Sequence, residues 1–192
     1  MLSPGDALVV VDVQVDFLPG GNLPVPHGDK ILPALHRYVE DFQRAGLAVV
    51  ATRDWHPPDH CSFIQQGGPW PPHCIAGSTG ARFALGLKLP TDVLIVSKAR
   101  NRQRDAYSAF EGTDLDKRLR QRSIKRVFVG GLATDYFVLH AVRDALKLGY
   151  QTVLLQDAIR AVEAKAGDGE RAIAQMLHLG AVPMAMEHWG SP

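Results

Sequence analysis

A short apolar stretch that runs into two glycines and then into an amphipathic segment is the feature that most constrains the fold of this chain. Residues 127–129 have the composition of a buried strand, Gly130 and Gly131 follow, and apolar residues then recur at helical spacing up to Leu148. Gly149 provides a typical helix end. A tight strand-to-helix turn directs unpaired backbone N–H groups at whatever lies above it, which suits a developing negative charge on oxygen. Taken alone, the same pattern is also an ordinary glycine turn of an α/β protein.

Alternating apolar runs and amphipathic segments extend along the whole chain. Strands are predicted at residues 7–11, 47–52, 93–97, 126–130 and 151–155, with a short final strand at 181–184. Helices are predicted at 29–44, 114–122 and 169–179, and a further helix opens from the glycine turn and ends at Leu148. Continuous β-branched runs separated by helices are typical of a parallel sheet with right-handed crossovers. We therefore expect an α/β fold, a three-layer α/β/α sandwich with a mainly parallel sheet of five or six strands, in a single domain of residues 1–192.

Composition excludes several classes of function. A net charge of +1 gives no sign of binding to nucleic acid or to an anionic membrane surface. No apolar run approaches the length that crosses a membrane, and no secretory signal pattern is recognised. The two cysteines, Cys61 and Cys74, form no disulfide framework, which fits the reducing cytoplasm. The expected partner is a small-molecule substrate, and association into a homo-oligomer stays open.

A long proline-rich connection, residues 53–92, carries a candidate metal site. Asp54, His56, His60 and His73 supply one carboxylate and three imidazoles. Mixed oxygen and nitrogen ligands suit one divalent ion such as Zn²⁺, Mn²⁺ or Fe²⁺, with water in the open positions. The alternative is that these histidines are solvated loop residues, because their spacing lacks the compact pattern of the stronger zinc motifs.

Polar residues follow the ends of several predicted strands. A predicted strand precedes each of the following: Asp12, Asp54, Lys98 and the turn at residues 133–137. Ligand sites in parallel sheets lie at the carboxyl ends of the strands, so these groups should meet at one edge. A buried pair of Asp12 and Lys98 could transfer a proton or activate a nucleophile, and it could equally be a structural ion pair.

Aromatic residues lie close in sequence to these polar groups. Four of them could enclose a flat ligand, although core packing is the commoner role of an aromatic side chain: Phe17, Trp70, Tyr107 and Tyr136. Cys61 and Cys74 each follow a candidate ligand histidine and could be soft ligands, reactive thiols or inert residues. Inert residues are the default expectation.

Five motifs in this order resemble the nicotinamidase (pyrazinamidase) branch of the isochorismatase-like cysteine hydrolases. The similarity extends from Val9 to about Val162. The motifs are residues 11–17 (VDVQVDF), 52–60 (TRDWHPPDH), 70–74 (WPPHC), 105–110 (DAYSAF) and 131–136 (GLATDY). In addition, Lys98 matches the catalytic lysine of the family.

The resemblance implies a role for each matching residue. Asp12 corresponds to the catalytic acid/base, and Lys98 would help to stabilise a thiolate. The metal ligands would be Asp54, His56 and His73, with His60 matching a fourth ligand of some members. The turn would contain a cis peptide at Leu132–Ala133 and an oxyanion hole built from the N–H groups of Ala133 and Phe137. The implied activity is metal-assisted hydrolysis of nicotinamide to nicotinic acid and ammonia in NAD salvage.

The resemblance breaks at Phe137, which stands where the family has its nucleophilic cysteine. A phenyl ring cannot attack a carboxamide or form a thioester, so the covalent route is closed. Loss of the nucleophile from such a catalytic unit costs several orders of magnitude in rate, and amidase activity is expected near background. Cys61 and Cys74 lie on the metal loop and are not placed to substitute.

Three interpretations follow. The first is a nicotinamidase-type protein with an intact fold and metal site but a replaced nucleophile, and we adopt it for family and site. The second is an isochorismatase-like hydrolase in which Asp12 protonates a vinyl ether, although the metal motif argues against it. The third is a non-catalytic protein that binds metal or a pyridine carboxamide. Whether the chain turns over a substrate stays open at this point.

Overall fold

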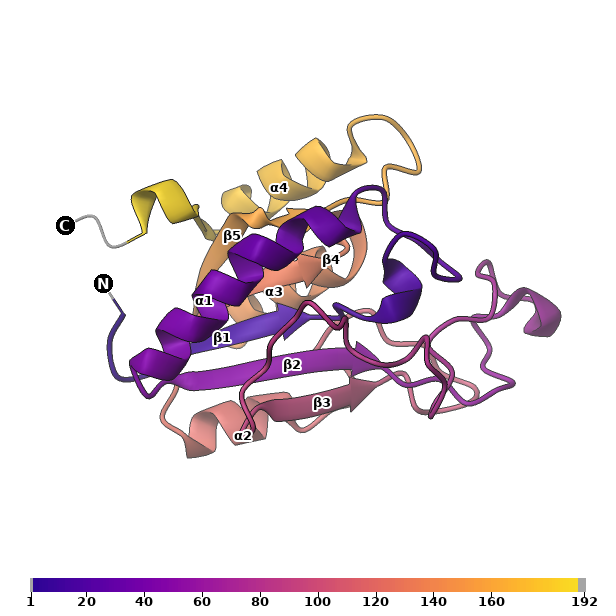
Figure 1. The fold of residues 1–192 in the computed structure, drawn as a ribbon, viewed down its shortest axis with the longest axis horizontal. Coiled ribbons are helices and arrows are strands. Elements are labelled where there is room, and N and C mark those ends of the chain that lie inside the picture. The colour runs from indigo at the N-terminus through magenta and orange to yellow at the C-terminus, as the bar shows by residue number, and fades with distance from the viewer. Residues whose placement is uncertain (1, 190–192) are drawn as a thin grey trace.

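The computed structural model describes residues 2–189, which form one six-stranded sheet flanked by helices (Figure 1). The strands are β1 (Asp6–Val11), β2 (Ala48–Asp54), β3 (Leu94–Lys98), β4 (Arg126–Leu132), β5 (Gln151–Arg160) and β6 (Val182–Met184). Their order is β3-β2-β1-β4-β5-β6, and every neighbouring pair is parallel. The predicted α/β class is confirmed, with six strands.

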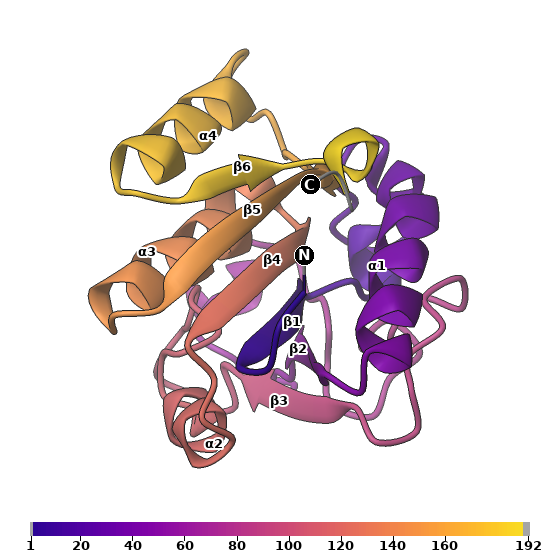
Figure 2. The same ribbon diagram turned by 90° about the vertical axis from the view of Figure 1, so that its left-hand side faces the viewer.

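Helices cover both faces of the sheet and complete the three layers (Figure 2). They are α1 (Leu32–Arg44), α2 (Leu115–Gln121), α3 (Leu139–Lys147) and α4 (Asp168–His178). The apolar face of α1 packs into one core cluster, whereas α2, α3 and α4 contribute to a second cluster on the other side. Within the described part of the chain, no helix is long and apolar enough to cross a membrane.

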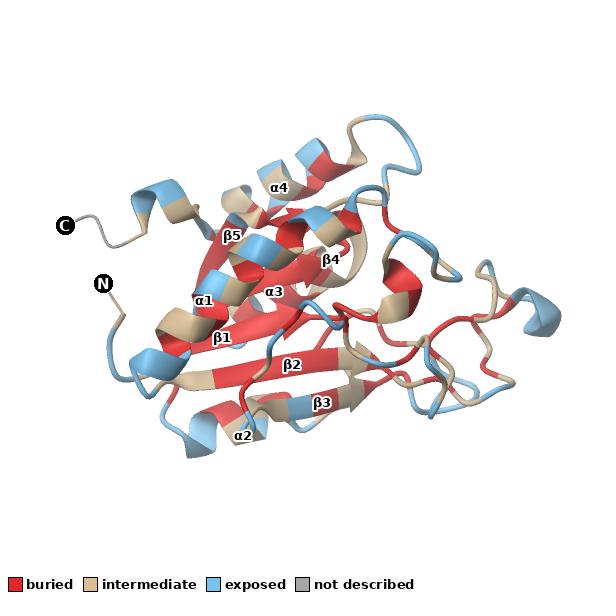
Figure 3. Ribbon diagram, viewed as in Figure 1, coloured by how far each residue is buried: buried red, intermediate tan, exposed pale blue. Residues whose placement is uncertain are grey.

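The burial pattern explains why these segments fold as they do. All six residues of β1 are buried, as expected for a central parallel strand covered on both faces (Figure 3). On α1 the buried side chains Leu35, Tyr38, Val39 and Phe42 recur at helical spacing, and the opposite face is exposed. Full burial of a side chain of this size contributes about 1.5–3 kcal/mol, which is enough to hold α1 against the sheet.

Two helices begin later than the sequence pattern predicts. The segment Gly28–Ile31 is a 3₁₀ turn, and α1 starts only at Leu32, with a proline in its first turn. Proline is tolerated there because its missing N–H would have no partner in the first turn. Before α3, the residues Thr134–Val138 form a turn of π-helix, largely within the turn that was predicted to open this helix. Such wide turns are frequent at functional sites.

Strand β5 is longer than predicted, because it continues past residue 155 to Arg160. Its pairing with β4 shifts register between Val129 and Gly131, so the extra residues are absorbed in an irregularity of the sheet. Ala158 and Ile159 are buried beyond the shift. The polar pair Gln156 and Asp157 therefore interrupts the apolar pattern without ending the strand.

Gly131 is required by a close approach between β1 and β4. Its φ is +132°, and a Cβ atom at this position would lie 2.1 Å from the carbonyl oxygen of Val11. We expect Gly131→Ala to lower the free energy of unfolding by about 3 kcal/mol, because backbone must shift to relieve the overlap. The matched control is Gly149→Ala, where φ is +89° and nothing lies within 4 Å. There the loss should be about 1 kcal/mol. Equal losses in urea denaturation would contradict this explanation.

Candidate active site

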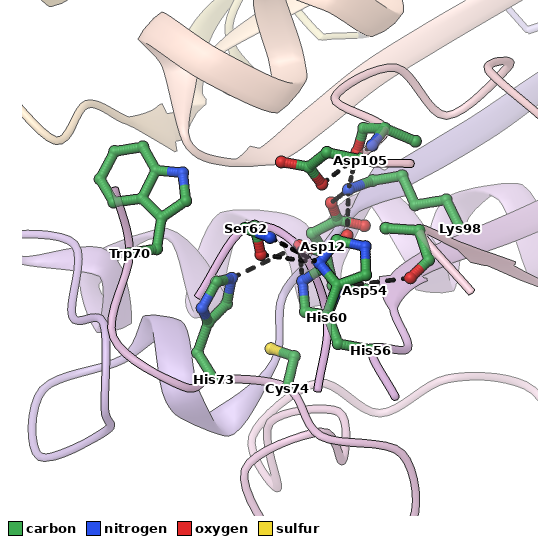
Figure 4. A network of polar contacts seen from close by, with 12 residues as sticks. Asp12, Asp54, His56, His60, Ser62, Trp70, His73, Cys74, Lys98 and Asp105 are labelled. Carbon is green, nitrogen blue, oxygen red and sulfur yellow. Dashed lines mark hydrogen bonds and ion pairs between the residues drawn. The ribbon is translucent and has the colours of Figure 1, made fainter. Parts of the chain in front are cut away.

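The site lies at the carboxyl edge of the sheet, where three predicted residues meet. Asp12 directly follows β1, and Asp54 and Lys98 are the last residues of β2 and β3. These two strands pair with Asp54 opposite Lys98, so both side chains project from the same face. Figure 4 shows the resulting network of polar contacts.

Lys98 forms a buried ion triad rather than the simple pair with Asp12 that the sequence suggested. Its Nζ lies 2.8 Å from Oδ2 of Asp12, contacts Oδ1 of Asp54 and donates to the carbonyl oxygen of Ala106 at 3.2 Å. The Thr52 hydroxyl donates to Oδ1 of Asp12 at 2.6 Å. All three charged side chains are at most 2% exposed. One ammonium thus faces two carboxylates, and the triad as a whole is anionic.

The electrostatics separate the two carboxylates. Burial raises the pKa of Asp12 to about 6, although Lys98 opposes this shift. Burial would also raise the pKa of Asp54, but there Lys98 and His56 outweigh it and hold the pKa well below its usual range. For Lys98, the two carboxylates outweigh burial and raise the pKa above its usual value. Asp54 is therefore suited to bind a cation, and Asp12 to hold a proton.

Asp54, His56 and His73 converge as a candidate metal triad. One ligand atom from each lies within 4.8 Å of the others, and all three side chains are buried. Oδ2 of Asp54 lies 3.4 Å from Nε2 of His56 and 3.9 Å from Nε2 of His73. The loop at residues 53–92 thus brings together three ligands predicted from the sequence.

The surrounding contacts fit a metal ion at this triad. Nδ1 of His56 faces the carbonyl oxygen of Ala99 at 3.3 Å, and Nδ1 of His73 faces that of Pro71 at 2.8 Å. A carbonyl only accepts hydrogen bonds, so each Nδ1 carries the proton and each Nε2 keeps its lone pair for a metal. Nε2 of His56 is buried and makes no hydrogen bond. Burial lowers the pKa of His73, which keeps this ligand neutral.

His60 lies beside this triad rather than within it. Its ring packs against the ring of His56, with the two centroids 4.2 Å apart. Nδ1 contacts the Ser62 hydroxyl at 2.7 Å, and Nε2 faces the carbonyl oxygen of Arg104 at 3.3 Å. Burial lowers the pKa of His60. With His56 and Asp105 it forms a second cluster of ligand atoms, again within 4.8 Å of one another.

Gln14 is a positioning residue to which sequence reasoning assigned no role. Its amide oxygen accepts from the backbone N–H of Asp54 at 2.8 Å, and its amide nitrogen donates to the carbonyl oxygens of Asp54, at 2.8 Å, and Ala81, at 3.0 Å. The side chain therefore fixes the backbone of a candidate metal ligand. In the sequence, only its position inside the motif at residues 11–17 could have indicated a role for Gln14.

Asp16 holds the second half of the metal loop in a similar way. Its Oδ2 accepts from the backbone N–H of Cys74 at 2.7 Å, directly after His73, and its Oδ1 accepts from Asn22 at 3.1 Å. Burial raises the pKa of the Cys74 thiol and keeps it protonated. Cys74 therefore serves the loop through its backbone, in line with the default expectation of an inert thiol.

The turn after β4 carries Phe137, the residue that the resemblance aligns with a nucleophile. The peptide bond Leu132–Ala133 is cis, as the resemblance implied. The Phe137 ring lies over Lys98, with its centroid 3.9 Å from Nζ, and packs against Phe17 at 5.5 Å and Tyr107 at 5.7 Å. An apolar ring thus stands directly above the ion triad.

A small cavity of about 40 Å³, partly open to solvent, lies above the metal triad. All four predicted aromatic residues line it together with Phe137, namely Phe17, Trp70, Tyr107 and Tyr136. The Trp70 indole donates to the Tyr107 hydroxyl at 3.0 Å, which fixes both rings. The cavity is thus lined by apolar side chains on its sides and by candidate metal ligands at its base. This lining suits a flat heteroaromatic molecule with a few polar atoms.

We predict that Gln14→Leu weakens metal binding through Asp54. The variant leaves the buried N–H and carbonyl of Asp54 without partners, so it should lower the free energy of unfolding by about 2 kcal/mol. Loss of such an outer contact should lower zinc affinity by about 10- to 100-fold. Isothermal titration of metal-free protein with Zn²⁺ measures the second effect, and Gln66→Leu, on an exposed loop, is the control. An unchanged affinity would contradict the positioning role.

The raised pKa of Asp12 predicts a pH-dependent stability. Its folded pKa of about 6 lies above the ordinary value of 3.8, so the folded state favours the protonated carboxyl. The stabilising contribution is complete below about pH 4 and is lost as pH rises through 6. In metal-free protein, wild type should therefore lose stability relative to Asp12→Asn between pH 4 and 6. Urea unfolding across this range measures the difference, and a constant difference would contradict the assignment.

Comparison with known proteins gives the family. A model described as the isochorismatase domain matches residues 6–188. The nicotinamidase of Escherichia coli K12 is 36% identical over an alignment of 207 residues that covers 97% of each chain. The crystal structure of Pyrococcus horikoshii pyrazinamidase in complex with zinc has 48% identity and a TM-score of 0.92, covering 95% of this chain and 100% of that one.

A second solved structure, of a relative with a bound ligand, is similar to this chain in sequence and fold. The structure of PnC1 from L. infantum in complex with nicotinate has 37% identity and a TM-score of 0.86, and it covers 96% of this chain and 94% of that one. Sequence and fold are thus shared over nearly the whole length. This chain therefore belongs to the isochorismatase-domain family, among its nicotinamidase and pyrazinamidase members.

Proposed function

We propose that this chain is a nicotinamidase-type protein, one domain of residues 1–192, that binds a divalent metal and a nicotinamide-like ligand but has lost covalent amidase chemistry. The family relationship supports the ligand class, since relatives are named nicotinamidases and one is seen with nicotinate. Phe137 stands at the nucleophile position and offers no atom that can attack a carboxamide. By the same relationship, the setting would be cytoplasmic NAD salvage.

The observation that carries the proposal is the position of the Phe137 ring. It packs on Nζ of Lys98 and lines the cavity, whereas Asp12 and Lys98 are buried and are not among the cavity-lining residues. A ligand in the cavity would thus meet the ring before it met the proton-carrying groups. Binding can persist while the chemistry is blocked.

Different residues of the cavity would bind the metal, the ring and the carboxamide. Asp54, His56 and His73 would hold Zn²⁺, Mn²⁺ or Fe²⁺, with His60 beside them, and the bound ion would supply a Lewis acid for a heteroaromatic nitrogen or a water. The aromatic walls would enclose the ligand ring. The N–H groups of Ala133 and Phe137 would orient a carboxamide oxygen.

Acid-catalysed vinyl-ether hydrolysis is the second candidate function, and the raised pKa of Asp12 favours it, because the carboxyl keeps a proton to donate. Burial argues against it. Both oxygens of Asp12 face Thr52 and Lys98, and the side chain is 0% exposed. A purely binding role needs no such access, so it agrees better with the geometry.

Ammonia release from nicotinamide tests the proposal. We expect the metal-loaded wild-type protein to stay at background and Phe137→Cys to exceed it by several orders of magnitude, because the new thiol lies above Asp12 and Lys98. Phe137→Ala is the matched control, since it opens the same space without supplying a nucleophile. It should remain inactive but bind nicotinate more tightly than wild type.

Two results would contradict the proposal. Ammonia release by the wild-type protein would show that Phe137 does not block the chemistry. A folded, metal-loaded Phe137→Cys variant that neither binds nicotinamide nor releases ammonia would exclude the ligand class. A vinyl-ether substrate would then be tested next.

A further inference from the structure

Asp135 joins two walls of the cavity through hydrogen bonds to backbone. It lies in the turn Thr134–Val138, directly before two aromatic residues that line the cavity. Its Oδ1 accepts the backbone N–H of Val162 at 2.9 Å, and its Oδ2 accepts that of Glu163 at 3.0 Å. Val162 lines the same cavity from the connection between β5 and α4. One carboxylate thus holds together two segments that lie 27 positions apart in the sequence.

The form of this contact makes it a strong link. A carboxylate that accepts backbone N–H groups forms charge-assisted hydrogen bonds, which are stronger than bonds between neutral groups. Asp135 is half-buried, so water competes only in part for its oxygens. Glu163 has a φ of +57°, in the left-handed region that side chains disfavour. Such a conformation persists where its surroundings hold it, and the bond from its N–H to Asp135 does so.

The side chain of Glu163 holds the other end of the same connection. Its Oε2 accepts the N–H of Gly167 at 2.7 Å, and its Oε1 accepts that of Gly169 at 2.9 Å, in the first turn of α4. Gly169 is required there, because a Cβ atom would lie 2.6 Å from Oε1 of Glu163. Residues 161–169 thus form a compact loop that lies, like the metal loop, at the carboxyl end of the sheet (Figure 1).

Val162 is the point at which this loop reaches the cavity. Its side chain is half-buried and packs against the core cluster that contains Phe17, another lining residue. The cavity is only about 40 Å³ in volume, so the place of a single side chain in its wall decides much of its shape. Asp135 is not among the lining residues. It can therefore act on a ligand only through Val162 and the turn that carries it.

We propose that Asp135 is a positioning residue that fixes Val162 in the cavity wall against which a flat ring binds. Without the carboxylate, two backbone N–H groups lose their partners, and residues 161–163 populate conformations in which Val162 leaves the wall. The apparent affinity for a ring then falls with the fraction of molecules that remain competent to bind it. The inference rests on the nicotinamide-like ligand proposed above and adds a residue that sets its affinity without touching it.

Two ligands of different size test this role in Co²⁺-loaded protein. Nicotinate, followed by isothermal titration, needs the cavity wall, whereas azide, followed by the visible absorption of Co²⁺, needs only an open position on the ion. Asp135→Ala should weaken nicotinate binding about tenfold and leave azide binding unchanged. The matched control is Asp168→Asn, which alters a carboxylate that accepts the N–H of Lys165 at 2.8 Å in the same connection. It should bind nicotinate as wild type does.

Further variants separate positioning from a general loss of stability. Val162→Ala should weaken nicotinate binding about tenfold, because it removes the wall directly. Asp135→Ala added to Val162→Ala should cause little further loss, since both changes act through the same side chain. Additive losses would overturn the proposal. Asp135→Asn keeps one accepting oxygen and should bind nicotinate with an affinity between those of wild type and Asp135→Ala.

The outcomes distinguish this inference from the proposed function. In a folded Asp135→Ala variant, the amide hydrogens of Val162 and Glu163 should exchange faster than in wild type, and those of β1 should not. Unchanged exchange, or nicotinate affinity equal to that of wild type, would overturn the positioning role alone. A wild-type protein that binds azide but no nicotinate would overturn the proposed ligand class, and the role of Asp135 with it.

Discussion

The buried ammonium of Lys98 between Asp12 and Asp54 is the interaction on which the site depends. Removing charges from water is costly, and the cost is recovered only where geometry and hydrogen bonds are nearly complete. Here Thr52 and the carbonyl oxygen of Ala106 supply the remaining contacts. The parallel pairing of β2 and β3 brings Asp54 opposite Lys98, so the sheet itself sets the spacing of these charges. The same carboxylate faces the metal histidines with its second oxygen, which joins the ion triad to the metal triad.

The metal loop is ordered by side chains that bind backbone. Between β2 and β3 the chain forms one short 3₁₀ turn and isolated β-bridges, one of which pairs His56 with Ile75. Side chains from elsewhere add to this limited backbone pairing. Gln14 and Asp16, both from the segment after β1, bind the backbone at Asp54 and Cys74. Buried side-chain hydrogen bonds of this kind fix the ligands before an ion arrives, because moving them would leave polar groups unpaired.

Phe137 lies at the point where the turn after β4 meets the ion triad. The turn contains a cis peptide and a wide helical turn, and the Phe137 ring packs against Tyr107. Above Lys98 lies the face of this ring, which attracts the ammonium and offers no nucleophilic atom. The fold and the arrangement of the site do not by themselves determine the chemistry, which under the proposal above depends on the residue at position 137.

The sequence by itself determined the α/β class, because continuous apolar strands and amphipathic helices leave a local pattern that burial enforces. It also determined the order of the motifs, and the resemblance they carry led to the family that the comparisons show. Only the tertiary structure decided that Lys98 bridges two carboxylates, that Gln14 clamps Asp54, and that Asp105 joins His60. These contacts link residues such as Gln14 and Asp54, which are 40 positions apart, so no local periodicity records them. The extension of β5 past Gln156 could not be predicted from the sequence either. It depends on pairing with β4, which outweighs the polar interruption in the apolar pattern.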